Sequence, residues 1–419
     1  MAEVQTVQPR VPAAGSRKPT GRQIVVLGAL SAFGPLSLDM YLPGLPSLTR
    51  ELGASASAGQ LTITACMLGL GLGQLVAGPV SDHHGRRRPL LAGLVGYSAA
   101  SLACAVAPSI GILIAVRLIQ GMAGGVGVVI ARAVVRDLCA GAVAARMFSL
   151  LMAITGVAPV FAPLVGGQAL AFTSWRGVFV ILALIGAPLL VATATWLPET
   201  LPVERRHGGG LRTTLRTFRR LLRDRRFTPY AVSFSLSFSA MFAYIAGSSF
   251  VLENIHGLSP QLFSVVFAVN SAGLIAMTQV GGRLVGGVGA AVLLRRGLVG
   301  VACASVVTLL VTVAGAGLGW LLISFFALLS ANGLVLPNGT AAALAEQEGA
   351  LGAASALLGL GQFGFGAVVA PLVGLGGGHD ALPMAVVIAV AGVAAMVVDL
   401  VFAPRTLRRS AKPAPGARL

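Results

Sequence analysis

Two charged residues stand inside stretches that are otherwise apolar and long enough to cross a lipid bilayer. Asp39 lies in the segment 24–47, and Arg117 lies in the segment 110–133. An Asp or Arg at the centre of a membrane helix costs roughly 2.5–3.5 kcal/mol on insertion scales. Burial away from water favours the neutral acid, and a nearby cation favours the carboxylate. A conformational change that alters either influence would make Asp39 bind and release a proton.

The same two charges also admit a purely structural interpretation. Asp39 and Arg117 could form a salt bridge that only fixes the packing of two helices. In the proton-coupling interpretation, which we favour, Asp39 exchanges the proton and Arg117 is the cation coupled to it.

A very short connection at residues 78–88 combines an acid, a turn glycine and three arginines. It begins with Gly78 and contains Asp82, Gly85, Arg86 and Arg87. Gly85 supplies a residue that tolerates positive φ in a tight turn, and Asp82 can accept charge-assisted hydrogen bonds. A loop that only sets membrane topology would need the arginines alone. The connection therefore has more chemistry than membrane topology requires.

These residues must be positioned by membrane-spanning helices, because the composition excludes a chain folded around one soluble core. Of the 419 residues, 56% are hydrophobic and only 10% are charged. A span needs about 20 apolar residues. Segments of this kind predict an all-α membrane protein with twelve spans in two six-helix halves. The predicted spans are 24–47, 58–80, 89–107, 110–133, 146–171, 175–197, 228–253, 261–284, 293–315, 318–342, 353–376 and 382–403.

The formal charge of +17 would suit a nucleic-acid-binding protein, but the positions of the charges exclude that class. With a cytoplasmic amino terminus, all but three of the 30 Lys and Arg residues fall in cytoplasmic segments, the exceptions being Arg50, Arg117 and Arg176. This asymmetry follows the positive-inside rule and predicts that both termini are cytoplasmic. Arg far outnumbers Lys, and Ala, Gly and Val are abundant, which is typical of a high-GC bacterium. We expect a multi-pass protein of the bacterial cytoplasmic membrane.

The predicted domain organisation has five parts. A basic amino terminus (1–21) precedes the first half (22–197), and a basic cytoplasmic linker (198–227) joins it to the second half (228–403) and a basic tail (404–419). In the linker, Leu211, Leu215, Phe218 and Leu222 form one face of a helix whose remaining positions are rich in Arg. Such a helix is expected to lie on anionic lipids of the cytoplasmic leaflet, although a solvated linker helix would show the same pattern.

Four motifs resemble those of the major facilitator superfamily, and within it the Bcr/CflA branch of drug:proton antiporters. The loop 78–87 resembles the family's G-x-x-x-D-x-x-G-R-R signature, and 39–46 is similar to D-M-Y-L-P-x-L-P. Residues 117–121 are similar to R-x-x-Q-G, and 158–167 resembles the antiporter motif G-x-x-x-G-P-x-x-G-G. The resemblance implies the twelve-helix fold of that family. It also implies that Asp39 binds protons or cationic substrates and that Arg117 acts in coupling. The signature loop implies that residues 78–87 latch helices on the cytoplasmic side and govern the switch between outward-facing and inward-facing states.

Two features of this chain depart from the family pattern. His83 stands where the signature loop usually has Arg, and Ala158 and Ala162 replace the leading glycines of the antiporter motif. Because these glycines are altered, a proton-coupled importer or exporter of sugars or other metabolites stays open beside a drug exporter. A membrane sensor without transport activity is the alternative from another class.

Small residues and prolines mark the helices that we expect to pack closely or to bend. Glycines allow close helix approach, and prolines free backbone carbonyls inside a span. The predicted interface and gating residues are Gln120, Gly121, Pro159, Pro163, Gly166, Gly167 and Pro371.

The substrate cavity is predicted only as a set of candidates. An apolar surface with a few hydrogen-bonding groups is what a small-molecule site requires. The candidates are Met40, Tyr41, Phe238, Met241, Phe242, Tyr244, Asn270, Asn332, Asn338, Gln362 and Phe363.

Taken together, these features predict proton-coupled efflux of small, largely apolar compounds, such as drugs or antibiotics, by alternating access. The chain carries no nucleotide-binding loop and no pairing of a nucleophile with a base, so we expect neither ATP-driven transport nor an enzyme. The Cys and His residues lack metal-ligand spacing. We expect no metal and no cofactor other than protons, and we expect a monomer.

Overall fold

The computed structural model describes residues 19–139, 141–206, 211–345, 347 and 351–403, and within them every regular element is helical. The α-helices are α1 (Gly21–Asp39), α2 (Leu45–Glu51), α3 (Ala56–His84), α4 (Arg87–Ala105), α5 (Ile110–Leu138), α6 (Gly141–Ala169), α7 (Trp175–Trp196), α8 (Leu211–Leu221), α9 (Thr228–Ser249), α10 (Pro260–Val288), α11 (Ala290–Val313), α12 (Leu318–Leu344), α13 (Leu351–Val373) and α14 (Leu382–Phe402). Four short helices join them: η1 (Leu42–Gly44), η2 (Val203–Arg205), the π-helical η3 (Phe250–Ile255) and η4 (Gly374–Gly376).

Each predicted span corresponds to a helix whose bounds lie within a few residues of those expected, except for 24–47, where α1 ends at Asp39 and η1 and α2 follow. In the described part of the chain, 11 helical segments are long and apolar enough to cross a membrane. The predicted span 89–107 corresponds to α4, which is not one of them because it begins with two arginines and contains Tyr and several Ser and Gly residues. The expectation of an all-helical, multi-pass membrane fold is therefore confirmed.

The chain divides into two compact units, and the division does not follow the chain strictly. Within the described residues, unit 1 contains the chain up to Ala54, Leu61–Leu211 and also Ser259–Ala268, the start of α10. Unit 2 contains the described residues of Arg212–Leu258 and of the chain from Val269 on, together with Ser55–Gln60 at the start of α3. Each unit thus includes a short segment that belongs in sequence to the other half.

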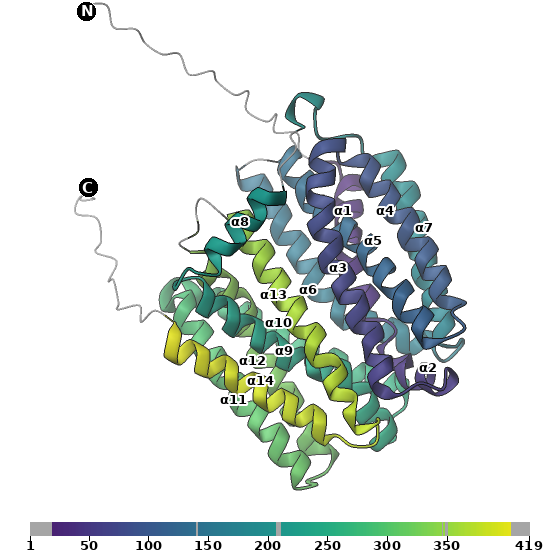
Figure 1. Cartoon of the computed structure of the whole chain (residues 1–419), viewed down its shortest axis with the longest axis vertical. Coiled ribbons are helices and arrows are strands. Elements are labelled where there is room, and N and C mark those ends of the chain that lie inside the picture. The colour runs from purple at the N-terminus through teal and green to yellow at the C-terminus, as the bar shows by residue number, and fades with distance from the viewer. Residues whose placement is uncertain (1–18, 140, 207–210, 346, 348–350, 404–419) are drawn as a thin grey trace, which may run out of the picture. The chain divides into compact units, whose positions relative to one another are not determined.

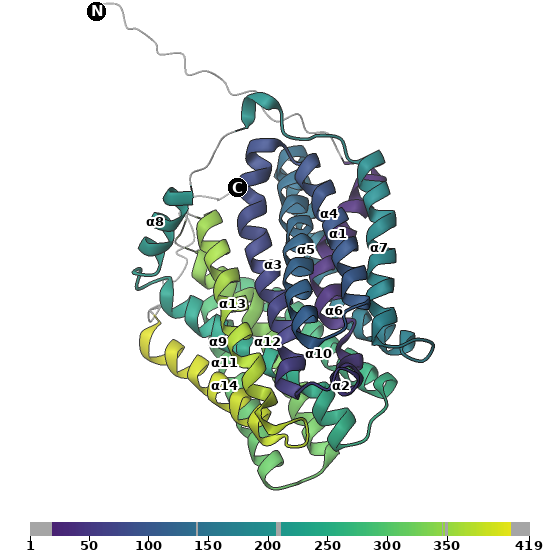
Figure 2. The same cartoon turned by 45° about the vertical axis from the view of Figure 1, so that its right-hand side comes forward.

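Unit 1 is built around α1, which packs against α5, α6 and α7, while α4 packs between α5 and α7. In Figures 1 and 2, α4 runs beside α7. Buried side chains of α1, α4, α5, α6 and α7 form one apolar cluster that includes Leu30, Leu94, Val134 and Leu151. This cluster holds the helices that carry the predicted coupling residues.

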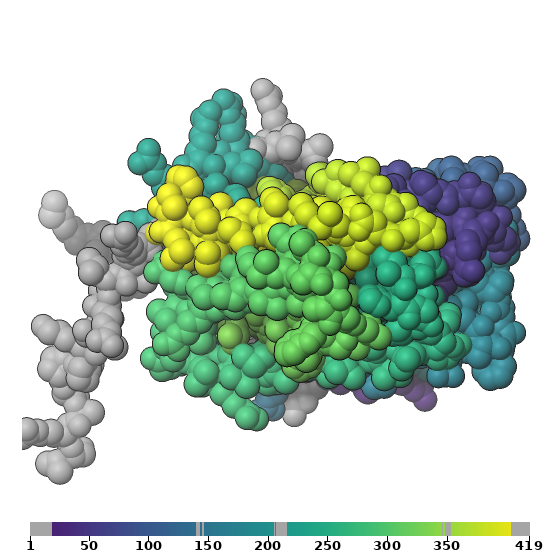
Figure 3. Space-filling view, turned by 90° about the horizontal axis from the view of Figure 1, so that it is seen from below, coloured from purple at the N-terminus to yellow at the C-terminus, as the bar shows by residue number. Residues whose placement is uncertain are grey.

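Unit 2 repeats the packing pattern of unit 1 with its own helices. Here α9 packs against α12, α13 and α14, and α11 packs between α12 and α14. Figure 3 shows α14 in yellow alongside the green helices of this unit. The shared pattern indicates that the two units are structural repeats of one helical plan.

Glycines bring the backbones of α3 and α5 into direct contact. A Cβ added at Gly121 would overlap the carbonyl oxygen of Cys66, and one at Gly73 would overlap that of Met122. No side chain larger than hydrogen fits at either place without a backbone shift. Gly121 therefore lies at the contact between α3 and α5.

The basic linker contains the predicted helix. In α8 and the turn after it, Phe218 and Leu221 are buried, whereas Leu222 is 56% exposed. Leu221 lies three residues after Phe218 and shares its face of the helix. The contact of this helix with lipid stays a prediction. The side chains of Leu211 and Leu215 lie outside the described residues, as do the predicted termini up to residue 18 and from 404 on.

Candidate functional site

Asp39 is the last residue of α1, at the point where the helix breaks. Pro43 and Gly44 follow in η1 and prevent α1 from continuing regularly into α2. The side chain of Asp39 is buried, with 6% of its surface exposed. Within the described residues its carboxyl group makes no ion pair and no hydrogen bond to another side chain.

Arg117 of α5 is fully buried, and neutral groups surround its guanidinium. It donates hydrogen bonds to the carbonyl oxygens of Ser37 (2.8 Å) and Thr62 (3.4 Å) and to Oε1 of Gln120 (2.6 Å). The ring of Tyr41 covers it at 4.3 Å from the ring centre. One side chain thereby joins α1, α3 and α5.

A second layer of hydrogen bonds holds this arrangement in place. Gln120 donates from Nε2 to the hydroxyl of Ser101 (2.7 Å), and the hydroxyls of Ser37 and Tyr97 lie 2.8 Å apart. The hydroxyl of Tyr41 is bonded to that of Thr62 at 2.8 Å. Satisfied polar networks of this kind rigidify a low-dielectric interior.

The salt bridge between Asp39 and Arg117, the structural alternative, is absent from the described residues. The guanidinium instead binds the carbonyl of Ser37, two residues before the acid. Arg117 therefore fixes the end of α1 while leaving the carboxyl group of Asp39 without a partner. A buried carboxyl group in that state can exchange a proton or bind a cation.

Helix α6 touches the backbone immediately beside Asp39. A Cβ added at Gly166 would meet the carbonyl oxygen of Met40 far inside contact distance, and one at Gly167 would meet the hydroxyl of Ser264. Gln261 donates from Nε2 to the carbonyl oxygen of Gly167 at 3.1 Å. Gly166 and Gly167 thus lie at close contacts of α6. Pro159 and Pro163 lie inside the same helix, and Pro371 lies inside α13.

The predicted switch loop forms a compact ionic cluster between α3 and α4. The Arg86 side chain is bonded to Asp82, to the hydroxyl of Ser81 (2.8 Å) and, through Nε, to Asp137 of α5 (2.9 Å). Burial lowers the pKa of Arg86, but the hydrogen bonds to Asp137 and Asp82 outweigh it, so the pKa is raised. Gly85 adopts φ +87°, a backbone conformation that favours glycine over residues with a side chain. Gly78, by contrast, makes no close contact.

Glu199, which follows α7, caps the amino terminus of α4. Its carboxylate accepts hydrogen bonds from the backbone N–H groups of Arg86 (2.8 Å) and Arg87 (3.1 Å), and from those of Thr200 and Leu201. Burial raises the pKa of Glu199, but these four backbone donors outweigh it and lower the pKa. The carboxylate is thus held in its charged form, where it suits the positive end of a helix.

The loop supports a prediction that compares Asp82→Asn with Gly85→Leu. Asp82 is half exposed, and Arg86 keeps Asp137, so Asp82→Asn should lower stability by about 1 kcal/mol or less. Transport should fall about fivefold or more, because a change of ~1 kcal/mol in the free-energy difference between the two conformations shifts their ratio by that factor. Gly85→Leu must adopt positive φ and would press on Glu199, so it should reduce both expression and transport.

Expression is measured by size-exclusion chromatography of a fluorescent fusion, and transport by substrate accumulation at matched expression. If Asp82→Asn loses expression and transport in equal proportion, the cluster around Arg86 is only structural.

The cavity candidates of unit 2 form two connected groups. Phe238 stacks on Phe242 of the same helix at 5.9 Å and meets the edge of Phe363 at 6.5 Å. In the second group, Asn270 donates to the hydroxyl of Tyr244 at 2.8 Å. Met241 is buried in α9, the helix of Tyr244. Gln362, which precedes Phe363 in α13, is partly buried.

Several of the cavity candidates are buried residues with partners of their own. Asn332 accepts from Ser237 and donates to the carbonyl of Leu328, and Asn338 donates to the carbonyl of Leu334. Met40 and Tyr41, in unit 1, are fully buried. Tyr41 belongs to the Arg117 network, because its ring and hydroxyl are both engaged there.

Sequence reasoning did not assign a site role to three acids. Asp137 and Glu199 complete the ionic cluster. Asp399 of α14 is 1% exposed and pairs with Nε of Arg295 at 2.9 Å, which ties α14 to α11. An acid near the end of an apolar span was its only sequence signal. Among the described residues, no cluster of His, Cys, Asp and Glu could hold a metal.

Comparisons with known proteins agree with this architecture. The profile of the Major Facilitator Superfamily matches residues 27–371. An uncharacterized MFS-type transporter of Bacillus subtilis (strain 168), YdgK, is 40% identical over 381 residues, which cover 90% of this chain and 94% of the relative. A bicyclomycin resistance protein homolog of Haemophilus influenzae is 30% identical over 352 residues, which cover 84% and 88%. The solved D-xylose–proton symporter shares the fold, with a TM-score of 0.67, 15% identity and coverage of 91% and 98%.

Proposed function

Because the chain belongs to the Major Facilitator Superfamily, we propose that it exports small, largely apolar compounds across a bacterial cytoplasmic membrane in exchange for protons. It works by alternating access, as a monomer with both termini in the cytoplasm. The relative described as a bicyclomycin resistance protein homolog supports a drug-like substrate. The antiporter motif supports exchange, since its last two glycines are retained at contacts of α6.

The observation that carries the proposal is the buried carboxyl group of Asp39, which has no ion-pair partner in the described residues. In the proposed cycle Asp39 takes up a proton from the outer side and releases it toward the cytoplasm. Arg117 keeps the end of α1 fixed through the carbonyl of Ser37 during both steps. The cluster around Arg86 holds α3, α4 and α5 together in one state and loosens in the other.

Substrate accumulation in cells tests the direction of transport. Cells that express the protein should accumulate less of an apolar fluorescent dye than cells that carry the empty vector. A protonophore should remove the difference, because the proton gradient supplies the energy. A panel of neutral and cationic dyes keeps the test independent of one substrate.

Two results would contradict the proposal. Higher accumulation of a solute in expressing cells would identify an importer. Equal accumulation of every compound, at confirmed membrane insertion, would favour a sensor without transport activity.

A further inference from the structure

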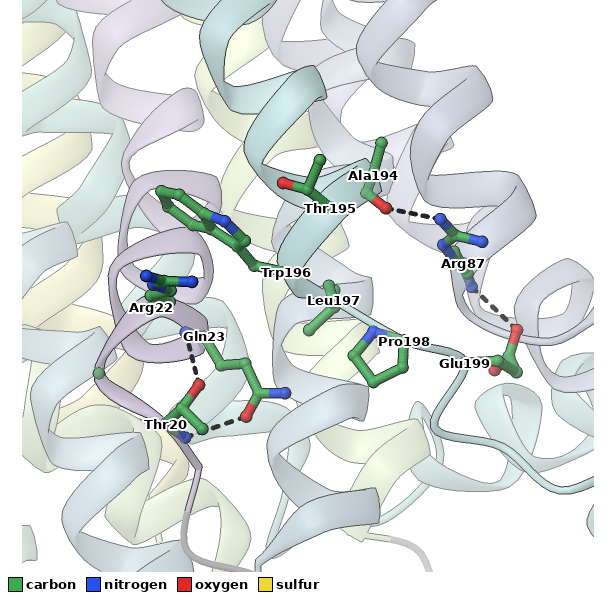
Figure 4. Close-up of a pocket in the computed structure, with 11 residues that line it drawn as sticks. Thr20, Arg22, Gln23, Arg87, Ala194, Thr195, Trp196, Leu197, Pro198 and Glu199 are labelled. Carbon is green, nitrogen blue, oxygen red and sulfur yellow. Dashed lines mark hydrogen bonds between the residues drawn. The ribbon is translucent and has the colours of Figure 1, made fainter.

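A cavity of about 940 Å³ opens at the end of unit 1 where α1 begins and α7 ends. Figure 4 shows that its wall combines Arg22 and Gln23 of α1, Arg87 of α4, Trp196 of α7, and Glu199. The volume is that of a small-molecule site. The cavity is distinct from the region of Asp39 and Arg117. It lies at the first residues of α1 and the last residues of α7, whereas Asp39 is at the opposite end of α1.

The charge that faces this cavity is positive. Arg22 is exposed, stands 5.6 Å from the ring centre of Trp196 and makes no ion pair within the described residues. The exposed Arg87 donates to the carbonyl of Ala194 at 2.6 Å, which leaves most of its N–H groups unused. Both oxygens of Glu199 are occupied by backbone N–H groups. The lining therefore contributes two guanidinium groups and one carboxylate, and the carboxylate already accepts hydrogen bonds from backbone N–H groups.

The cavity also borders the apolar surface of the membrane spans. Trp196 is the last residue of α7 and is 39% exposed, and tryptophan is enriched at the boundary between hydrocarbon and water. Val25 lies one helical turn after Arg22 and is 65% exposed, and Val191 lies one turn before Thr195 and is 62% exposed. A basic recess therefore continues into an exposed apolar surface.

We propose that this cavity binds the phosphodiester headgroup of an anionic membrane lipid. The guanidinium groups of Arg22 and Arg87 bind the phosphate oxygens, to which Arg is geometrically suited. The indole of Trp196 packs against the glycerol region, and the acyl chains follow the surface of Val25 and Val191. A soluble phosphate would use only the charged part of this surface. A lipid uses both parts, and basic pockets between spans are suited to such headgroups.

Native mass spectrometry of the full-length protein, purified in detergent, tests the proposal with phosphatidylglycerol as the probe. Retention is compared with that of phosphatidylcholine, which has the same chains and no net charge, and with inorganic phosphate as a competitor. The test variant is Arg22→Gln. The matched control is Arg88→Gln, which removes an equal charge from the exposed neighbour of Arg87 without altering the cavity lining.

We expect phosphatidylglycerol to be retained in preference to phosphatidylcholine. Arg22→Gln should weaken this retention about fivefold, since a basic residue near an anionic lipid contributes about 1 kcal/mol. Arg22→Lys should recover part of the loss, and Arg88→Gln should bind as the native protein does. Equal retention in Arg22→Gln and the native protein, or equal retention of both lipids, would overturn the proposal. Full displacement by millimolar phosphate would identify a soluble-anion site instead.

A second measurement locates the bound lipid. Phosphatidylglycerol brominated near the glycerol end of its chains should quench part of the tryptophan fluorescence, and Trp196→Phe should remove that part. Trp196 is exposed, so this substitution leaves the core intact. Quenching that is unchanged in Trp196→Phe would place the lipid elsewhere and contradict the assignment.

Discussion

Asp39→Asn should abolish export driven by a pH gradient and leave the fold intact. Asparagine keeps the size and hydrogen-bonding capacity of the side chain but cannot exchange a proton. Because the native carboxyl group has no ion-pair partner in the described residues, its replacement leaves no cation unpaired. Insertion should be unimpaired, since the change removes an acid that costs roughly 2.5 kcal/mol or more in a membrane helix. Accumulation in cells should return to the level of the empty vector.

The decisive measurement is substrate-induced proton release from purified protein, compared between the native protein and Asp39→Asn. A neutral substrate should still bind the variant, whereas a cationic substrate should bind more weakly. Asp399→Asn is the matched control, because Asp399 is also a buried acid but is already paired with Arg295. It should lower stability and keep proton release. Undiminished proton release and transport in Asp39→Asn would make Asp39 structural.

The structure changes what is expected of Arg117. From the sequence, Arg117→Ala would leave Asp39 buried without a partner. In the structure the acid already lacks that partner, and Arg117 binds the carbonyls of Ser37 and Thr62. Its removal should therefore loosen the junction of α1, α3 and α5, and impair folding more than Asp39→Asn does. Removing Arg117 leaves neutral acceptors buried without their donor, which typically costs about 1–3 kcal/mol for each group.

The helices were predictable because apolar length is a property of the sequence itself. Span 175–197 was expected and α7 occupies Trp175–Trp196. The break after Asp39 was not predicted, because 24–47 was expected as one span, although Pro43 and Gly44 account for it. The direct contact at Gly121 was indicated by small residues at helical spacing. These features depend on local composition, which acts over one or two helical turns.

The partners of the charged residues were not predictable in the same way. Every residue has a backbone carbonyl, so the sequence does not show that Arg117 would bind the one of Ser37. The intramembrane acid Asp39 was therefore the only partner that sequence reasoning could suggest. Glu199 reaches the backbone of Arg86 across 113 residues, and Asp399 reaches Arg295 across 104. Helix rotation decides which acid faces which cation. Leu221 and Leu222 show how one residue of rotation exchanges buried and exposed positions.

Gly166→Ala should inactivate transport, and the same change at Gly156 should not. Both glycines lie in α6. A methyl group at Gly166 would overlap the carbonyl oxygen of Met40, whereas a Cβ at Gly156 would have no neighbouring atom within 4 Å. Because the obstacle is backbone, no rotamer change can relieve the overlap. Either α6 must move away or the turn after Asp39 must shift.

Both movements displace Asp39 from the position that Arg117 fixes. We expect Gly166→Ala to lower stability by about 1–3 kcal/mol, the usual cost of overpacking, and to reduce transport to background even where the protein is still expressed. Gly156→Ala should transport normally and gain up to about 1 kcal/mol, because alanine is the better helix former. Thermal unfolding of fluorescent fusions and dye accumulation at matched expression measure the two effects. Native transport by Gly166→Ala would show that α6 does not control the position of Asp39, and the coupling proposed for this contact would then fail.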